Sequence, residues 1–163
     1  MRVIVISDTH GSIHSLNQII ENNKNADAFI HLGDGEYEWD KMCSSITDKN
    51  ELDKYHYVKG NCDYNDTYPL YKIIPIAGHR IFATHGHRYS VKYSLDVLLD
   101  TAKRKECDIV LYGHTHVQQQ TYQNGIYVMN PGSAALPRDE KGRSYGWIDI
   151  TPNGIITNTV PLD

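Results

Sequence analysis

Five short clusters of metal-binding residue types occur along the chain, each directly after a stretch that favours a β-strand. The clusters combine carboxylate, amide and imidazole side chains, which are common ligands of divalent cations in proteins. They are Asp8-Thr9-His10, Gly33-Asp34, Gly60-Asn61-Cys62-Asp63, His85-Gly86-His87 and Gly113-His114-Thr115-His116. Together they offer enough ligands for two cations held about 3.5–4 Å apart, an arrangement that suits hydrolysis of phosphate esters.

The acidic clusters indicate where a first cation would bind. Asp8 and His10 lie two residues apart and can approach one cation from the same loop. Asp34 is a single carboxylate between two glycines, which makes it the natural bridge between two cations. Two dications bring four positive charges and these two aspartates bring two negative charges, so a local positive charge remains for a phosphate.

The neutral clusters complete the ligand set. His114 and His116 are two residues apart, so one of them can reach each cation. Asn61 offers an amide oxygen and His85 an imidazole nitrogen, which supply the remaining ligands of the second cation. Metal-bound water has a pKa lowered towards neutrality, to about 7 in favourable sites, so a nucleophile forms without a side-chain base.

The elements around the clusters alternate between strands and helices in the first half and become hairpins in the second. Strands are predicted over residues 2–7, 27–32, 55–59 and 109–112, with hairpins over 71–84, 117–129 and 146–160. Helices are predicted from residue 13 onwards and over 90–106, where Val91, Leu95, Leu98, Leu99 and Ala102 form one apolar stripe. This mixture predicts two packed sheets with helices outside them, and the clusters at the ends of the strands.

The composition is that of a soluble globular protein, with 40% hydrophobic and 22% charged residues in 163 positions. The net charge of −4 and the scattered 16 lysines and arginines disfavour a long nucleic-acid strand as a partner. The apolar run Val3–Ile6 is too short for a signal-peptide core, and no stretch has membrane-spanning length. Three cysteines without framework spacing predict reduced thiols and a cytoplasmic protein.

The ordered series DTHG, GD, GNCD, THGH and GHTH resembles the calcineurin-like metallophosphoesterase superfamily, whose motifs are D-x-H, G-D, G-N-x-D/E, a lone His and G-H-x-H. Residues 130–138 extend the likeness to the small, single-domain branch of prokaryotic phosphodiesterases. The resemblance implies an α/β fold, a four-layer α-β-β-α sandwich of two mixed sheets flanked by helices, in one domain over residues 1–163. It also implies a dinuclear centre, with a first metal held by Asp8, His10, Asp34 and His116, and a second held by Asp34, Asn61, His85 and His114.

One position departs from the commonest form of the family. Many members carry a histidine after the asparagine, and it is credited with protonating the leaving group, whereas this chain has Cys62. The small branch commonly has cysteine here, but a thiol with a pKa of about 8.5 is a less suitable acid. We therefore expect His87 to assist with the substrate or leaving group. Ser133 and Arg138 are open to two interpretations, as phosphate contacts or as a turn residue and a surface cation.

The leading hypothesis is a phosphodiesterase that hydrolyses small phosphodiesters by in-line attack of a metal-bridging hydroxide. Manganese is the expected metal, and the mixed ligands also admit iron, zinc and nickel. The alternative is a non-catalytic, metal-binding scaffold for protein interactions, like the retromer subunit of related fold; such scaffolds tend to lose ligands, and none is missing here. A nuclease would carry extra domains and a basic groove. The edge strands of the C-terminal half offer a way to form a homo-oligomer.

Overall fold

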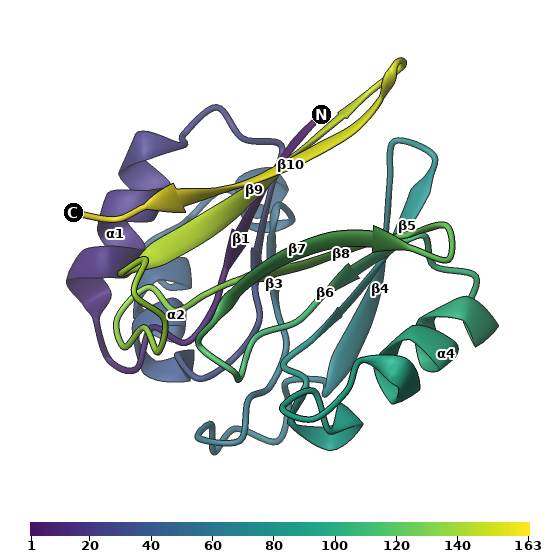
Figure 1. Ribbon diagram of the computed structural model, residues 1–163. Helices are drawn as coiled ribbons and strands as arrows, with labels where there is room; N and C mark the ends of the chain where they lie inside the picture. Colours follow the sequence, from purple (N-terminus) through teal and green to yellow (C-terminus); the bar gives the residue numbers. More distant parts are fainter.

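The computed structural model describes residues 1–163 and contains two five-stranded sheets packed face to face (Figure 1). The first sheet has the order β10 (Gly154–Pro161), β9 (Ser144–Thr151), β1 (Arg2–Ile6), β2 (Ala28–His31), β3 (Tyr55–Tyr57). The second has the order β4 (Tyr71–Ile76), β5 (His79–Thr84), β6 (Ile109–Leu111), β8 (Ile126–Pro131), β7 (Gln118–Gln123). Each sheet combines parallel and antiparallel pairs, as expected for the mixed sheets of this fold.

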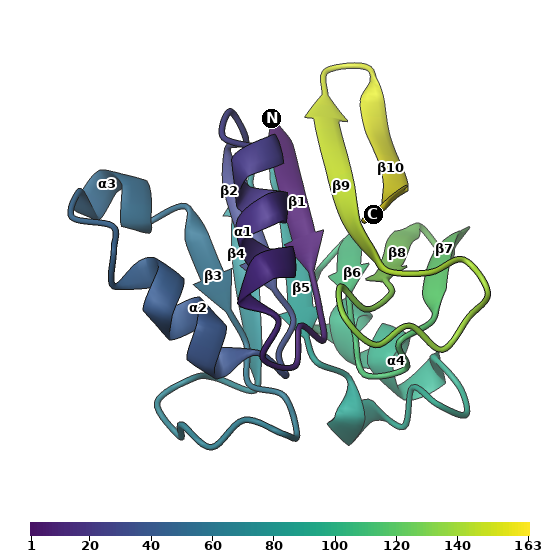
Figure 2. The same ribbon diagram turned by 90° about the vertical axis from the view of Figure 1, so that its left-hand side faces the viewer.

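Helices cover the outer faces of both sheets and produce four layers (Figures 1 and 2). Helices α1 (Ile13–Asn22) and α2 (Glu36–Cys43) lie on the first sheet, and α4 (Asp96–Arg104) lies on the second. Two shorter helical segments, α3 (Lys49–Leu52) and the 3-10 turn η1 (His87–Tyr89), follow α2 and β5. The four-layer α-β-β-α sandwich is confirmed. No helix is both long and apolar enough to span a membrane.

The continuous apolar run of β1 reflects its position between two apolar layers. Val3 and Val5 point into the core between the sheets, where they join Ile30, Ile81 and other strand residues. Ile4 and Ile6 point the opposite way, into the core beneath α1 and α2. A strand buried on both faces needs apolar residues at every position, because successive side chains alternate between faces.

The helix predicted over residues 90–106 is shorter in the structure, and this boundary was wrong. Ser90 adopts a left-handed backbone conformation (φ 55°), which no α-helix tolerates. The Ser94 hydroxyl then accepts a hydrogen bond from the Asp96 amide at 3.0 Å, and α4 begins there. Val91 and Leu95 still pack into the apolar cluster beneath α4, which explains why the stripe seemed to extend further.

The loops that carry the five clusters meet at one edge of the sandwich. Strands β1, β2 and β3 are parallel, as are β5 and β6, so within each sheet the loops after these strands leave on the same side. Backbone hydrogen bonds join these loops, from the Asp8 amide to the Gly33 carbonyl (3.1 Å) and from the Gly113 amide to the His85 carbonyl (3.0 Å). A bond from the His114 amide to Asp8 Oδ2 (3.1 Å) links the two sheets.

Candidate metal centre

Five of the seven candidate ligands have a left-handed backbone, a conformation that residues other than glycine rarely adopt. Their φ angles lie between 43° and 67°, at Asp8, His10, Asp34, His114 and His116. Each such residue costs free energy of order 1 kcal/mol or more and persists only where the surrounding structure enforces it. The strained turns at the strand ends place these five side chains at the same edge of the fold, and turns without strain would orient them differently.

Two glycines allow the clusters to approach one another. A Cβ atom at Gly60 would lie 2.0 Å from Asp34 Oδ1, and a Cβ at Gly113 would lie 1.9 Å from Ser7 Oγ. Real Cβ atoms do not approach other atoms this closely, so any larger residue would push the loops apart. Packing at the site therefore requires glycine at both positions, Gly60 and Gly113.

The first group of candidate ligands is formed by Asp8, His10 and His116. One ligand atom from each lies within 4.8 Å of the other two. His116 Nε2 is 3.1 Å from Asp8 Oδ1 and 3.2 Å from His10 Nε2. His10 Nε2 is also 3.9 Å from Asp34 Oδ2, so Asp34 borders this group. Residues that are more than a hundred positions apart in sequence thus converge on one point.

The atoms of the first group that face each other are mainly acceptors. His116 Nδ1 lies 2.6 Å from the Leu136 carbonyl, which can only accept, so Nδ1 carries the proton in neutral His116 and Nε2 presents its lone pair. Asp8 Oδ1 is buried and makes no hydrogen bond. Because lone pairs converge on a buried carboxylate oxygen without a donor, the arrangement fits a bound cation.

The charges in the first group favour a positive species there. Burial raises the pKa of Asp8, but the nearby His116 and His85 rings and the hydroxyl of Ser7 lower it by more, so that the pKa is about 2. Burial lowers the pKa of His116, but the Asp8 carboxylate and the Leu136 carbonyl together raise it by more. The site therefore attracts either a proton or a metal cation, and the two compete for His116.

The second group is formed by Asp34, Asn61 and His85. His85 is completely buried and its Nδ1 lies 2.7 Å from the Leu32 carbonyl, which fixes the proton on Nδ1. Its Nε2 lies 3.1 Å from Asn61 Oδ1 and 3.5 Å from Asp34 Oδ2. Asp34 therefore borders both groups, in the position expected of a shared ligand.

The His114 side chain makes no polar contact with either group. Its ring lies edge-on to that of His85, with the centroids 5.0 Å apart, and its side chain makes no hydrogen bond. Burial and the charges of His85 and Lys92 lower the pKa of His114 to about 4, so its imidazole is neutral at physiological pH. The ring nitrogens of His114 are free to bind a cation, and the rings of His85 and His87 lie beside it.

Asp63 organises the turn that carries Asp34. Its carboxylate accepts five hydrogen bonds, from the amides of Asp34 (2.9 Å), Gly60 (2.7 Å), Gly35 (3.0 Å) and Glu36 (3.2 Å) and from the Tyr57 hydroxyl (2.8 Å). Asp63 belongs to the third sequence cluster but is not among the predicted metal ligands. The feature of the sequence that could have indicated this role is the acidic residue at the end of the G-N-x-D/E motif.

His31 supports the same turns from within the fold. The ring is completely buried, accepts from the Gly33 amide through Nδ1 (3.1 Å) and lies 2.9 Å from Thr9 Oγ1 through Nε2. Burial lowers its pKa to about 3, so the ring is neutral. It joins the loop of Asp8 and His10 to the loop of Asp34. No motif marks it, because its partners become neighbours only in the fold.

The two residues considered for the leaving group both lie near the centre. The Cys62 amide donates to Asp34 Oδ1 at 2.8 Å, and the Cys62 sulfur groups with His10 and Asp34. Burial, together with the hydrogen bond and charge of Asp34, raises the pKa of the Cys62 thiol to about 11. The His87 ring lies 5.4 Å from that of His85, and His87 Nδ1 is buried without a partner.

The structure separates the two interpretations of Ser133. This residue is completely buried, and its hydroxyl donates to the Asp8 carbonyl at 2.7 Å and accepts from the amides of Ala135 and Leu136. Ser133 therefore holds the Asp8 loop and is not exposed to a phosphate. Arg138 is exposed, and its amide donates to the His116 carbonyl at 3.0 Å.

Comparison with known proteins agrees with the fold. The model of the calcineurin-like phosphoesterase superfamily domain matches residues 1–153, and the chain belongs to this family. It is 32% identical to a probable metallophosphoesterase, YsnB of Bacillus subtilis, over 92% of this chain and 85% of that protein. It is 27% identical to the phosphodiesterase YfcE of Escherichia coli, over 91% and 88% of the two chains. A crystal structure of a predicted phosphoesterase from Streptococcus pneumoniae superposes with a TM-score of 0.77 at 25% identity, over 98% and 97% of the chains.

Proposed function

We propose that the chain is a phosphodiesterase that hydrolyses small phosphodiesters with two divalent cations. The observation that carries this proposal is the convergence of Asp8 Oδ1, which is buried and has no hydrogen-bond donor, with the Nε2 atoms of His10 and His116. Membership of a phosphoesterase family supports the reaction class, and the phosphodiesterase name of the YfcE relative supports diesters.

The proposed ligands form two overlapping sets. The first comprises Asp8, His10, Asp34 and His116, and the second comprises Asp34, Asn61, His85 and His114. Cations bound there would acidify a water molecule for in-line attack and offset the charge that develops on the phosphate. The chain itself orients the ligands, because the carbonyls of Leu136 and Leu32 hold the Nδ1–H groups of His116 and His85 and turn both Nε2 atoms inward.

We propose that the leaving group departs with little help from a protein acid. Cys62 holds its proton tightly, since its thiol pKa is raised to about 11, and so it is a weak proton donor at neutral pH. Burial and the charges of His85 and Arg88 lower the pKa of His87, which is therefore a neutral hydrogen-bonding group. His87 lines a cavity beside Asn61, so its ring is suited to orient the substrate. Diesters with good leaving groups should be the better substrates.

Manganese is the proposed metal, and the mixture of oxygen and imidazole ligands also accommodates iron, zinc or nickel. The three free cysteines, Cys43, Cys62 and Cys107, support a reducing compartment, and we propose a cytoplasmic location. We further propose that residues 1–163 act as one metallophosphoesterase domain.

The test is turnover by protein stripped of metal and reconstituted with manganese. We expect hydrolysis of bis(p-nitrophenyl) phosphate, which should disappear in Asp34→Asn together with manganese binding measured by calorimetry. Asp100→Asn, which changes an exposed aspartate of α4 paired with Arg104, is the matched control and should behave as wild type. The proposal fails if no activated diester is hydrolysed and Asp34→Asn binds manganese as wild type does. Metal binding without turnover would favour the scaffold alternative.

A further inference from the structure

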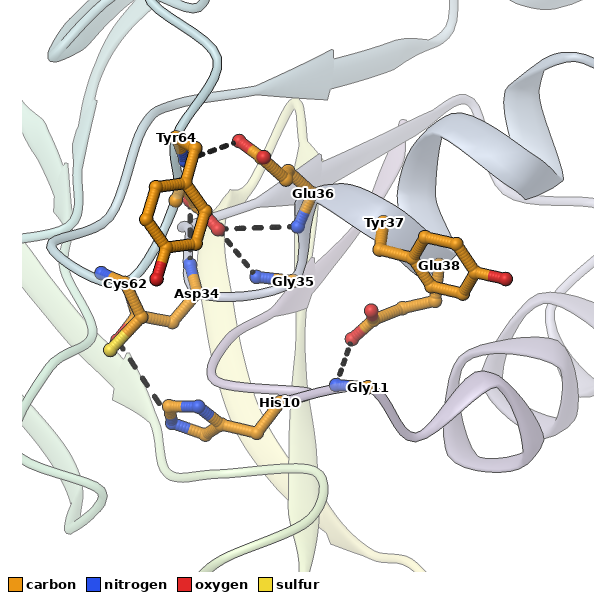
Figure 3. A pocket seen from close by; sticks show the side chains of 10 residues that line it. His10, Gly11, Asp34, Gly35, Glu36, Tyr37, Glu38, Cys62 and Tyr64 are labelled. Carbon is orange, nitrogen blue, oxygen red and sulfur yellow. Dashed lines mark hydrogen bonds and ion pairs between the residues drawn. The ribbon is translucent and has the colours of Figure 1, made fainter.

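A cavity with an aromatic outer wall opens beside the candidate metal centre. Its volume is about 260 Å³, and His10, Asp34 and Cys62 border its inner side while Tyr37 and Tyr64 stand at its mouth (Figure 3). Tyr64 is 88% exposed and Tyr37 is 70% exposed. A tyrosine that leaves its ring in water forgoes the burial energy of a large apolar group. Such a ring beside a reaction centre is available to a ligand.

Tyr64 is fixed in place by its backbone, while its side chain is free. The Tyr64 amide donates to Glu36 Oε2 at 2.9 Å, and the Asn65 amide donates to the same oxygen at 2.8 Å. Its ring makes no hydrogen bond and stacks on no other ring of the chain. Figure 3 draws this ring beside Cys62 and Asp34, whereas Tyr37 lies next to Glu38 with its hydroxyl turned away. Tyr64 is therefore the wall nearer to the metal ligands.

The carboxylates around the cavity are already engaged by the protein. Glu38 is buried and accepts from the Gly11 amide at 2.8 Å, Glu36 accepts from two backbone amides, and Asp63 accepts its five hydrogen bonds. No lysine or arginine lines the cavity. What it offers to a ligand is chiefly an aromatic face, and a second anionic group would be repelled by the acidic side chains behind it.

A second cavity on the other side of the same turn has the opposite character. It has a volume of about 440 Å³ and is lined by Lys59, Asn61, His87 and Arg88, among others. Arg88 forms no ion pair, so its charge is available. Asp63 borders both cavities. Because a phosphodiester carries two arms, a phosphate held at the centre can direct one arm towards each cavity.

We propose that Tyr64 determines specificity by stacking on a flat, uncharged aromatic arm of the substrate, such as an aryl group or a nucleobase. This inference rests on the proposed phosphodiesterase activity and adds the class of substrate. The arm enters the cavity beside α2 and the phosphate remains at the metal centre. A substrate whose aromatic arm stacks on Tyr64 should bind about three- to tenfold more tightly than one whose arm has no ring.

The test compares two phosphate monoesters as inhibitors of bis(p-nitrophenyl) phosphate hydrolysis by the manganese-loaded protein. Phenyl phosphate should inhibit about three- to tenfold more tightly than methyl phosphate. Tyr64→Ala should abolish this preference and raise KM with kcat nearly unchanged, whereas Tyr64→Phe should retain it. Tyr122→Ala is the matched control, because Tyr122 is also an exposed tyrosine but lies at the far end of β7 and should leave the preference unchanged.

Each outcome decides between the two proposals. If Tyr64→Ala still prefers phenyl phosphate over methyl phosphate, the proposed role of Tyr64 is wrong. If phosphocholine inhibits more tightly than phenyl phosphate, the proposal that the arm is uncharged and aromatic is wrong. If the wild-type protein hydrolyses no diester, the proposed function fails. Nuclear magnetic resonance spectra of the backbone amides of the isotope-labelled chain then test whether the cavity binds an aromatic group. A shift of the Tyr64 amide with phenyl phosphate but not with methyl phosphate supports the aromatic subsite, and equal responses overturn it.

Discussion

The two groups of candidate ligands differ in how completely the fold assembles them. All four side chains proposed for the first cation converge, with Nε2 of His10 3.2 Å from that of His116 and 3.9 Å from Asp34 Oδ2. Of the four proposed for the second cation, Asp34, Asn61 and His85 converge, but the His114 side chain makes no polar contact with any of them, although its ring lies as close to His85 as that of His10 lies to His116.

This difference follows from how each side chain is held. In the first group, the Leu136 carbonyl and the Asp8 carboxylate fix His116 from both sides of its ring. In the second group, His85 is fixed by the Leu32 carbonyl, while His114 is anchored only through its backbone amide. A ligand without a partner for its ring must lose rotamer freedom when it binds, which costs free energy. We therefore expect the first cation to bind more tightly than the second.

The largest expected effect comes from weakening the turn that carries Asp34, the ligand that both groups share. In Asp63→Asn, one carboxylate oxygen becomes an NH₂ group, which would face backbone N–H groups that now donate hydrogen bonds to Asp63. Two donors cannot pair, so the turn that carries Asp34 would lose its support. We expect a loss of about 10- to 100-fold in manganese affinity at both positions. The free energy of unfolding should fall by about 1–3 kcal/mol. Calorimetric titration and urea denaturation measure the two effects.

Asp66→Asn is the matched control for this change. Asp66 lies in the same loop, but its side chain is almost fully exposed and pairs only with Lys59. Exposed pairs of this kind contribute little to stability, so both measurements should remain close to wild type. Equal behaviour of Asp63→Asn and Asp66→Asn would show that the five hydrogen bonds do not position Asp34.

A smaller, selective effect is expected when one histidine is removed from each group. His10→Ala should weaken the tighter of two manganese-binding steps, because it removes a ligand atom from the converged group. His114→Ala should leave that step unchanged and weaken only the second. Calorimetric titration of the metal-free proteins gives both steps, and electron paramagnetic resonance reports the coupled manganese pair. Equal losses in the two variants would remove the distinction between the groups.

The sequence predicted the ligand types, their order and the strand ends that carry them. The five clusters are local, and each strand before them has a clear apolar pattern, so both were visible in the chain. The four-layer sandwich was inferred from the family resemblance and is confirmed by the two sheets and their helices. The apolar stripe over 90–106 misled the helix boundary, because periodicity does not register the left-handed Ser90.

The support around the ligands could not be predicted in the same way. Asp63, His31 and Ser133 act through backbone groups of distant loops, such as the bond from Ser133 Oγ to the Asp8 carbonyl 125 residues earlier. Left-handed angles at Asp8, His10 and His116 leave no compositional trace, since none of these residues is a glycine. The cavity beside Tyr64 depends on which of twelve tyrosines remains unpacked, and only the fold decides that.

The smallest expected effect at neutral pH concerns His31, which joins the loop of the first group to that of Asp34. Burial lowers its pKa to about 3, whereas an unfolded histidine has a pKa of about 6.5. Below pH 6.5 the unfolded chain therefore binds a proton that the folded chain excludes, and stability falls as the pH falls towards 3. His31→Gln keeps an acceptor and a donor for the same partners but removes this titration.

We expect the metal-free wild-type protein to lose about 1.4 kcal/mol of unfolding free energy per pH unit in excess of His31→Gln once the pH is well below 6.5. Urea denaturation of both proteins at pH 4.5, 5.5 and 6.5 measures this difference. The comparison between the proteins cancels the contribution of Asp8 and the other carboxylates, which titrate in both. Parallel pH dependences would mean that His31 accepts a proton inside the fold, so that the link between the two loops survives its ionisation.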